Sequence, residues 1–188
     1  VRNDQLGTQH YAPAEQRHAI IATPAVGDLD GDGVNELVVG TLNGALLAWH
    51  ADGTPVDGFP IWLDRDLVDG VTDPTNVYDY GFFASSALGD LDGDGTLEIV
   101  SGAMDSRVYA HHHDGTLVDG FPVELRTTYT TADGDRSNGE RVISSPALGD
   151  VDGDGTLEIV LGSNEKTTGT YGLAYMIRHD GPLDPNWP

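Results

Sequence analysis

The chain has 188 residues and contains no cysteine, and it has only 9 lysines and arginines against 31 aspartates and glutamates. Without cysteine, neither a disulfide nor thiol chemistry is available. The formal net charge of −22 argues against nucleic acid or an anionic membrane as a partner, because both are negatively charged themselves. No apolar run reaches the roughly 18 residues of a membrane-spanning helix, so we expect no membrane insertion.

The motifs of common catalytic machinery are missing as well. The sequence contains no G-x-S-x-G elbow, no H-E-x-x-H pair and no phosphate-binding P-loop. These absences favour a protein that is not an enzyme.

Acidic residues are abundant, and they concentrate in three copies of one loop. The copies read DLDGDGVNE at 28–36, DLDGDGTLE at 90–98 and DVDGDGTLE at 150–158. Carboxylates at loop positions 1, 3, 5 and 9 repel one another unless a cation lies between them. Glycines at positions 4 and 6 permit a sharp turn, and the carbonyl at position 7 can supply a further oxygen. Six or seven oxygen ligands suit Ca²⁺ better than Mg²⁺.

We therefore predict three Ca²⁺ sites, one in each acidic loop. An acidic turn without metal is the alternative for a single copy, but three copies that share all four acids favour metal binding. An EF-hand is excluded, because its closing Glu stands at position 12, where this chain has Val39, Ser101 or Leu161. The predicted ligands are Asp28, Asp30, Asp32, Val34 and Glu36; Asp90, Asp92, Asp94, Thr96 and Glu98; and Asp150, Asp152, Asp154, Thr156 and Glu158.

The repetition extends beyond the loops, whose first residues lie 62 and 60 positions apart. Each unit is expected to contain a strand, the acidic loop, a second and a third strand, an Asp-Gly turn and a fourth strand. The fourth strands are predicted to end at Phe59-Pro60, Phe121-Pro122 and Trp187-Pro188. Four antiparallel strands per repeat are typical of a propeller blade. We predict an all-β fold, a single β-propeller segment over 1–188 with three four-stranded antiparallel blades at approximately 19–63, 81–125 and 141–188.

The segments SSPALGD and DLDGDGTLEIVSGA closely resemble the FG-GAP or VCBS repeat of calcium-binding β-propellers, found in integrin α-subunit heads and in many secreted bacterial proteins. The resemblance covers most of 19–188. It implies that the loop joining the first two strands of each blade holds a structural Ca²⁺ through its four acids. The FG pair is represented by Gly81-Phe82, and the GAP element is reduced to Gly40-Thr41, Gly102-Ala103 and Gly162-Ser163.

Closed propellers typically have four to eight blades, so three blades form only part of a ring. We expect further blades from the same parent protein or from another chain to complete it, with a dimer of three-bladed halves as the alternative. Extracellular calcium modules depend on the high Ca²⁺ concentration outside the cell. We therefore expect a secreted or cell-surface protein.

Strand order assigns the loops to two faces of the blades. The acidic loops and the Asp-Gly turns share one face. The other, which we call the long-loop face, carries the connections at about 61–80 and 123–140 and an insertion at 167–172, and long loops on a rigid scaffold often bind ligands. The candidate contact residues are Asp64, Arg65, Asp66, Tyr78, Tyr80, Arg126, Tyr129, Asp133, Asp135, Arg136 and Tyr171, with ordinary solvated loop residues as the alternative.

A histidine cluster, His111, His112 and His113, is expected at the end of the third strand of the second repeat. Neighbours in a strand alternate sides, so at most His111 and His113 could share a metal, and no further ligand clearly completes a site. The corresponding residues are 49–51 and 177–179. A strand-end position that tolerates substitution is favoured over a transition-metal site.

Three functions remain open from the sequence. The first is a non-catalytic, calcium-stabilised extracellular β-propeller module for adhesion or recognition, with a protein or glycan ligand on the long-loop face. The second is part of a secreted polysaccharide-active enzyme such as a propeller-type lyase, in which Ca²⁺ assists proton abstraction from a uronate. This function would require a basic groove, and a chain with only 9 lysines and arginines shows no sign of one in its sequence. The third is a structural spacer in a large surface protein, which predicts no ligand.

Overall fold

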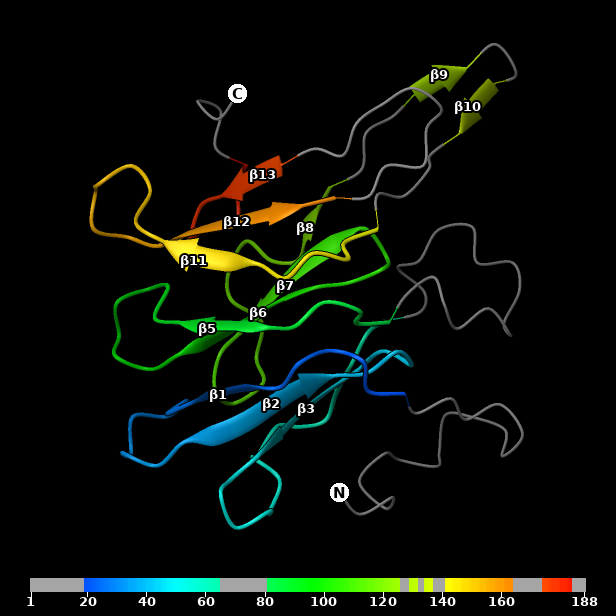
Figure 1. The fold of residues 1–188 in the computed structure, drawn as a ribbon. Helices are drawn as coiled ribbons and strands as arrows, with labels where there is room; N and C mark the ends of the chain where they lie inside the picture. The colour runs from blue at the N-terminus through cyan, green and yellow to red at the C-terminus, as the bar shows by residue number, and fades with distance from the viewer. Residues whose placement is uncertain are drawn as a thin grey trace.

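The computed structural model describes residues 19–64, 81–125, 129–131, 134–136, 141–163 and 174–183, and all regular elements in these residues are β-strands (Figure 1). They build three blades: blade one (19–64), blade two (81–125) and blade three (141–183). The all-β fold class with propeller-like blades is thereby confirmed. Within the described ranges, no helix is long and apolar enough to cross a membrane.

Blades one and two are four-stranded antiparallel sheets with the same strand order. Blade one contains β1 (Ala25–Gly27), β2 (Glu36–Gly40), β3 (Ala45–Trp49) and β4 (Ile61–Trp62). Blade two contains β5 (Ala87–Gly89), β6 (Glu98–Gly102), β7 (Arg107–His111) and β8 (Val123–Glu124). The register of the strands is also the same in the two blades. In blade one, Val38 lies opposite Ala25 and Ala48. In blade two, Val100 lies opposite Ala87 and Ala110.

Blade three shows the first three strands of the same pattern. It contains β11 (Ala147–Gly149), β12 (Glu158–Gly162) and β13 (Ala174–Ile177). Its predicted fourth strand falls outside the described residues. Between blades two and three, β9 (Tyr129–Thr131) and β10 (Gly134–Arg136) pair as an antiparallel hairpin inside a segment that the sequence predicts as a loop.

The predicted position of the fourth strand is wrong in blades one and two. The strand begins just after Phe59-Pro60 and Phe121-Pro122, whereas the prediction ends it there. The reason is a turn: after a single bridge between Trp49 and Pro55, the Phe59 N–H donates to the Val56 carbonyl at 3.2 Å and interrupts the pairing. Residues 61–64 and 123–125 therefore belong to the blades and not to the long connections.

Two of the three buried clusters form layers between neighbouring blades, and the third consists of blade-one residues alone: Ala22, Val39, Ala45, Leu47 and Trp49. Side chains alternate along each strand, so each sheet buries one face against the next blade. The first layer joins blades one and two, and the second joins blades two and three. Central members are Val38, Leu46 and Ala48 with Ile99 and Tyr109 in the first layer, and Val100, Val108 and Ala110 with Ile159 and Ile177 in the second.

At two equivalent positions, a glycine of one blade packs directly against a side chain of the next blade. A Cβ on Gly40 would lie 2.4 Å from the Cβ of Phe82, and one on Gly102 would lie 2.2 Å from Val142 Cγ1. Beside the first joint, the Phe82 N–H donates to the Thr41 carbonyl at 2.9 Å. The first two reduced GAP elements are thus positions where consecutive blades pack closely against each other.

The first strands of the blades lie next to one another, with β5 between β1 and β11 (Figure 1). The Thr23 N–H donates to Ser85 Oγ at 2.9 Å, and the Ser85 N–H donates to Ser145 Oγ at 3.2 Å. The equivalent residues Ser85 and Ser145 therefore each link their blade to the preceding one.

Candidate metal centres

The acidic loops join β1 to β2, β5 to β6 and β11 to β12, and they lie along one side of the molecule (Figure 1). The glycines at loop positions 4 and 6 have φ between +75° and +94° in all three copies. Only glycine adopts this left-handed conformation without strain. The turn that it permits brings the carboxylates of each loop together.

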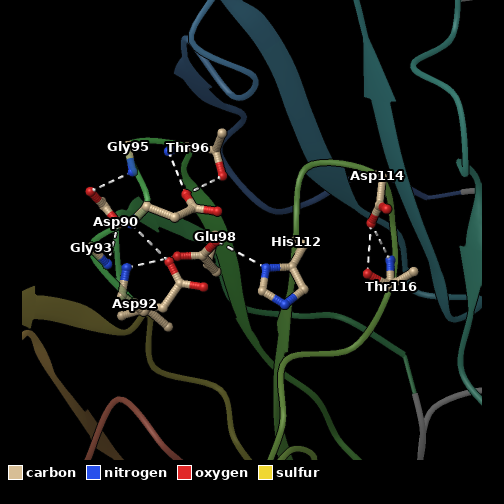
Figure 2. Close-up of polar contacts among 11 residues, drawn as sticks. Asp90, Asp92, Gly93, Gly95, Thr96, Glu98, His112, Asp114 and Thr116 are labelled. Carbon is tan, nitrogen blue, oxygen red and sulfur yellow. Dashed lines mark hydrogen bonds and ion pairs between the residues drawn. The ribbon is translucent and has the colours of Figure 1, made fainter.

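Backbone N–H groups orient the carboxylates in each loop. In blade two, Asp90 Oδ1 accepts the Gly93 N–H at 2.7 Å and Asp90 Oδ2 accepts the Gly95 N–H at 3.1 Å, while the N–H and hydroxyl of Thr96 donate to Asp94 Oδ1 (Figure 2). Blade three repeats these four bonds residue for residue. The Thr96 bonds hold the pKa of Asp94 below its usual range, which favours the charged form.

In each loop, three predicted ligands offer carboxylate oxygens that lie within 4.8 Å of one another. The groups are Asp28, Asp30 and Asp32 in blade one; Asp90, Asp92 and Asp94 in blade two; and Asp150, Asp152 and Glu158 in blade three. A cluster of this size can surround one hard cation with oxygen ligands.

Asp28 provides a test of whether these residues suit a cation. Its Oδ1 atom is buried and has no hydrogen-bond partner, while its Oδ2 accepts the Gly33 N–H at 2.9 Å. A buried carboxylate oxygen without a partner is unfavourable. A Ca²⁺ ion among the three aspartates of blade one would satisfy it, so the donor set fits the predicted metal.

The glutamate at position 9 closes each loop from inside the blade. Glu36, Glu98 and Glu158 are at most 2% exposed. Their Oε2 atoms accept the backbone N–H at position 2 of the same loop, at 2.9, 2.7 and 2.8 Å respectively. Burial raises the pKa of Glu98, so this carboxylate benefits from every positive partner.

Histidine side chains contact two of these glutamates, and sequence reasoning missed both contacts. His50 Nδ1 lies 3.3 Å from Glu36 Oε1, and His112 Nδ1 lies 3.2 Å from Glu98 Oε1. The available signal was the shared spacing of 14 residues between glutamate and histidine. At the corresponding position of blade three, the Arg178 Nε lies 3.3 Å from Asp180 Oδ1 in its own turn.

The neighbouring His111 points to the other face of β7. Its ring is buried and stacks on Tyr109, with centroids 6.0 Å apart and an interplanar angle of 3°. Burial, followed by the nearby His112, lowers the pKa of His111 to about 4. The interpretation of the histidines as a tolerant strand end therefore does not describe them, because His111 packs inside the core and His112 contacts an acidic loop.

The Asp-Gly turns lie on the side of the acidic loops, as the strand order predicts, because His112 begins one turn and contacts Glu98. The N–H and hydroxyl of Thr116 both donate to Asp114 Oδ1, and these bonds lower the pKa of Asp114. Neighbouring turns touch: a Cβ on Gly58 of blade one would lie 1.9 Å from the Asp114 carbonyl oxygen.

Most of the predicted contact residues on the long-loop face lie outside the described residues. These are Arg65, Asp66, Tyr78, Tyr80, Arg126, Asp133 and Tyr171. Asp64 is exposed, and the backbone places Tyr129, Asp135 and Arg136 in the β9–β10 hairpin. Three equivalent apolar residues just before the first strands, Ile21, Phe83 and Ile143, are 47%, 45% and 40% exposed.

A buried polar group lies beside the turn between β6 and β7. The Tyr109 hydroxyl donates to Asp105 Oδ2 at 2.5 Å, and Arg107 Nη1 lies 3.7 Å from the same oxygen. Burial raises the pKa of Asp105 despite these partners. Sequence reasoning gave no sign of this group.

Residues 90–161 match the sequence model of a family described as FG-GAP-like repeat. The structure is similar to the "Crystal structure of Pseudomonas aeruginosa PilY1 C-terminal domain", with a TM-score of 0.55 and 15% sequence identity. The similarity covers 84% of this chain and 36% of that one, so the present chain spans about a third of that domain. No curated protein matches the chain. The fold and the matched repeat define a β-propeller-like module.

Proposed function

We propose that the chain is a non-catalytic propeller segment stabilised by three structural Ca²⁺ ions, one in each acidic loop. The observation that carries the proposal is one loop built three times with its carboxylates gathered inward, together with the unpartnered, buried Oδ1 of Asp28. Ca²⁺ would be held by the acids at positions 1, 3 and 5, with Glu158 contributing in blade three. The position 7 carbonyls of Val34, Thr96 and Thr156 are proposed as further ligands.

The loops are placed where an ion would stabilise packing between blades. The side chain at position 2 is buried in the core layer, as Leu29 is in the first layer and Leu91 in the second. The Leu97 N–H in the second loop donates to the Leu29 carbonyl in the first at 2.9 Å. An ion that orders one loop would therefore also order part of the neighbouring blade, and binding to the folded state alone raises its stability.

For the whole protein, we propose adhesion or recognition of a protein or glycan at the long-loop face, in a secreted or cell-surface setting. The support is the position of the acidic loops on the opposite face and the exposure of Ile21, Phe83 and Ile143 at one equivalent position per blade. Apolar residues repeated at the surface are suited to contact a ligand. A structural spacer would show no binding to glycan or protein arrays when loaded with calcium.

We also propose that further blades pack on both ends of the segment. Between blades one and two, Leu88 fits against Gly27, where a Cβ would lie 2.9 Å from Leu88 Cδ1. On the outer face of blade three, a Cβ on the equivalent Gly149 would meet nothing within 4 Å. On the outer face of blade one, Val26, the equivalent of Leu88, is 62% exposed. Blade three thus exposes the glycine, and blade one the apolar residue, of the contact that joins neighbouring first strands inside the segment.

Calcium titration of chelator-treated protein tests the metal proposal. Calorimetry should give three Ca²⁺ per chain and a higher melting temperature. Asp152→Asn should reduce the number to two, because the amide oxygen still accepts the Asp154 N–H but the charge is lost. Asp52→Asn, a matched change in an Asp-Gly turn, should leave three. Equal effects of both variants, or no binding at all, would contradict the proposal.

A further inference from the structure

The side chains of Asp92, Glu98 and His112 meet at one point in blade two. They come from the acidic loop, the start of β6 and the first residue after β7, and their ligand atoms all lie within 4.8 Å of one another (Figure 2). Asp92 is shared with the aspartate group of the same loop, but His112 is a nitrogen ligand. Calcium favours oxygen ligands, whereas imidazole suits zinc, copper and nickel.

The distance between the His112 and Glu98 ligand atoms suits a small metal ion. Ligand atoms about 2.0–2.2 Å from a tetrahedral Zn²⁺ ion are separated by about 3.4 Å. His112 Nδ1 and Glu98 Oε1 are 3.2 Å apart. This is the upper end of the range for an N–H···O hydrogen bond, which is about 2.7–3.2 Å. The two atoms, now joined by a hydrogen bond, therefore need to move only slightly to bind one ion together.

The three ligands also differ in exposure in a useful way. Glu98 is buried and fixed through its other oxygen by the Leu91 N–H at 2.7 Å. The His112 side chain is 28% exposed, and Asp92 is exposed. An ion can thus enter from solvent and meet one rigid ligand and two that can adjust. The burial that raises the pKa of Glu98 also means that a cation here would relieve a poorly solvated carboxylate.

We propose that Asp92, Glu98 and His112 bind one borderline divalent transition metal ion of the Zn²⁺ class. Neutral His112 would bind through Nδ1, Glu98 through Oε1 and Asp92 through its carboxylate, with water completing the coordination. The site shares Asp92 with the proposed calcium ligands, so Zn²⁺ and Ca²⁺ would compete in blade two. Zinc binding itself does not rest on the calcium proposal.

The other two blades supply internal comparisons. Among the described residues, blade two holds the group within ligand distance that includes a histidine. His50 makes the same contact with Glu36, but the group in its loop consists of Asp28, Asp30 and Asp32. In blade three, Arg178 has no lone pair to offer a metal. We therefore expect one zinc ion per chain and not three.

The test is calorimetric titration of calcium-free protein with Zn²⁺, with Co²⁺ as a spectroscopic substitute. We expect one Zn²⁺ per chain and a visible Co²⁺ spectrum typical of nitrogen and oxygen ligands. His112→Arg, which copies blade three, should abolish both signals, while the matched change His50→Arg should leave them. Asp92→Asn should weaken binding without loss of fold, since the asparagine oxygen still accepts the Asp94 N–H, now bonded at 3.1 Å.

Several results would overturn the site. Zinc binding that survives in folded His112→Arg protein would place the ion on another histidine. Equal loss in the His50→Arg variant, or no stoichiometric zinc binding at all, would also refute it. If His112→Arg fails to fold by circular dichroism, the Asp92→Asn variant decides: unchanged zinc affinity there refutes the proposal. Failure of the calcium proposal would show separately, as an absence of Ca²⁺ binding in protein that still binds Zn²⁺.

Discussion

Gly58→Ala should destabilise the protein much more than Gly53→Ala, although both glycines have nearly the same backbone conformation. Their φ angles are +87° and +85°, so an alanine suffers the same left-handed strain, about 1–2 kcal/mol, at either position. The two differ in their surroundings. A Cβ on Gly53 meets nothing within 4 Å, whereas one on Gly58 would lie 1.9 Å from the Asp114 carbonyl oxygen of blade two.

The clash at Gly58 is with backbone and cannot be relieved by rotating a side chain. The two turns must separate, and overpacking of this kind typically costs about 1–3 kcal/mol. We therefore expect a loss of about 1–2 kcal/mol for Gly53→Ala and about 2–5 kcal/mol for Gly58→Ala. Urea unfolding at saturating Ca²⁺ measures both. Gly120→Ala should behave like Gly58→Ala, because its Cβ would lie 2.1 Å from the Asp180 carbonyl oxygen at the equivalent contact between blades two and three. Equal losses for Gly53 and Gly58 would refute the described contact between the turns.

Three further predictions follow from the packing between blades. Phe82→Ala should cost about 3–5 kcal/mol in urea unfolding, because the ring is buried, while Phe83→Ala next to it should change stability by less than about 0.5 kcal/mol; similar losses would contradict the assigned burial. Tyr109→Phe removes the hydroxyl donor of buried Asp105 and should cost about 1.5–3 kcal/mol, whereas no loss would show that the bond is absent. Because burial lowers the pKa of His111 to about 4 from an ordinary 6.5, the unfolded chain takes up its proton first as pH falls; stability should drop by about 3 kcal/mol between pH 6.5 and 4. His111→Phe should remove that part of the pH dependence, and an unchanged slope would refute it.

The repeat and the acidic loops could be predicted because both are local and periodic. Three copies of one motif fix the strand–loop–strand unit, and the short apolar runs that follow the loops predict β2 and β6, which are buried almost throughout. The fourth strands could not be placed in the same way. The segment before Pro60 also contains apolar residues, Val56 and Phe59, and the turn that they close depends on pairing with β3 rather than on composition.

Contacts between segments that are distant in the chain could not be predicted from the sequence either. Nothing local distinguishes His112 from His111 or His113, and only the return of β7 alongside β6 brings it to Glu98. The one usable signal was the spacing of 14 residues that separates Glu98 from His112 and also Glu36 from His50. The partnership of Asp105 with Tyr109 was likewise hidden, because an aspartate in a turn usually faces solvent.

The most direct test of the account is a crystal structure of the calcium-loaded protein, with anomalous scattering used to identify the ions. We predict three calcium peaks, each among the acidic residues of one loop, with the Asp28 Oδ1 atom bound to the first. Loops that hold only water at millimolar calcium, with carboxylates turned toward solvent, would contradict the central claim.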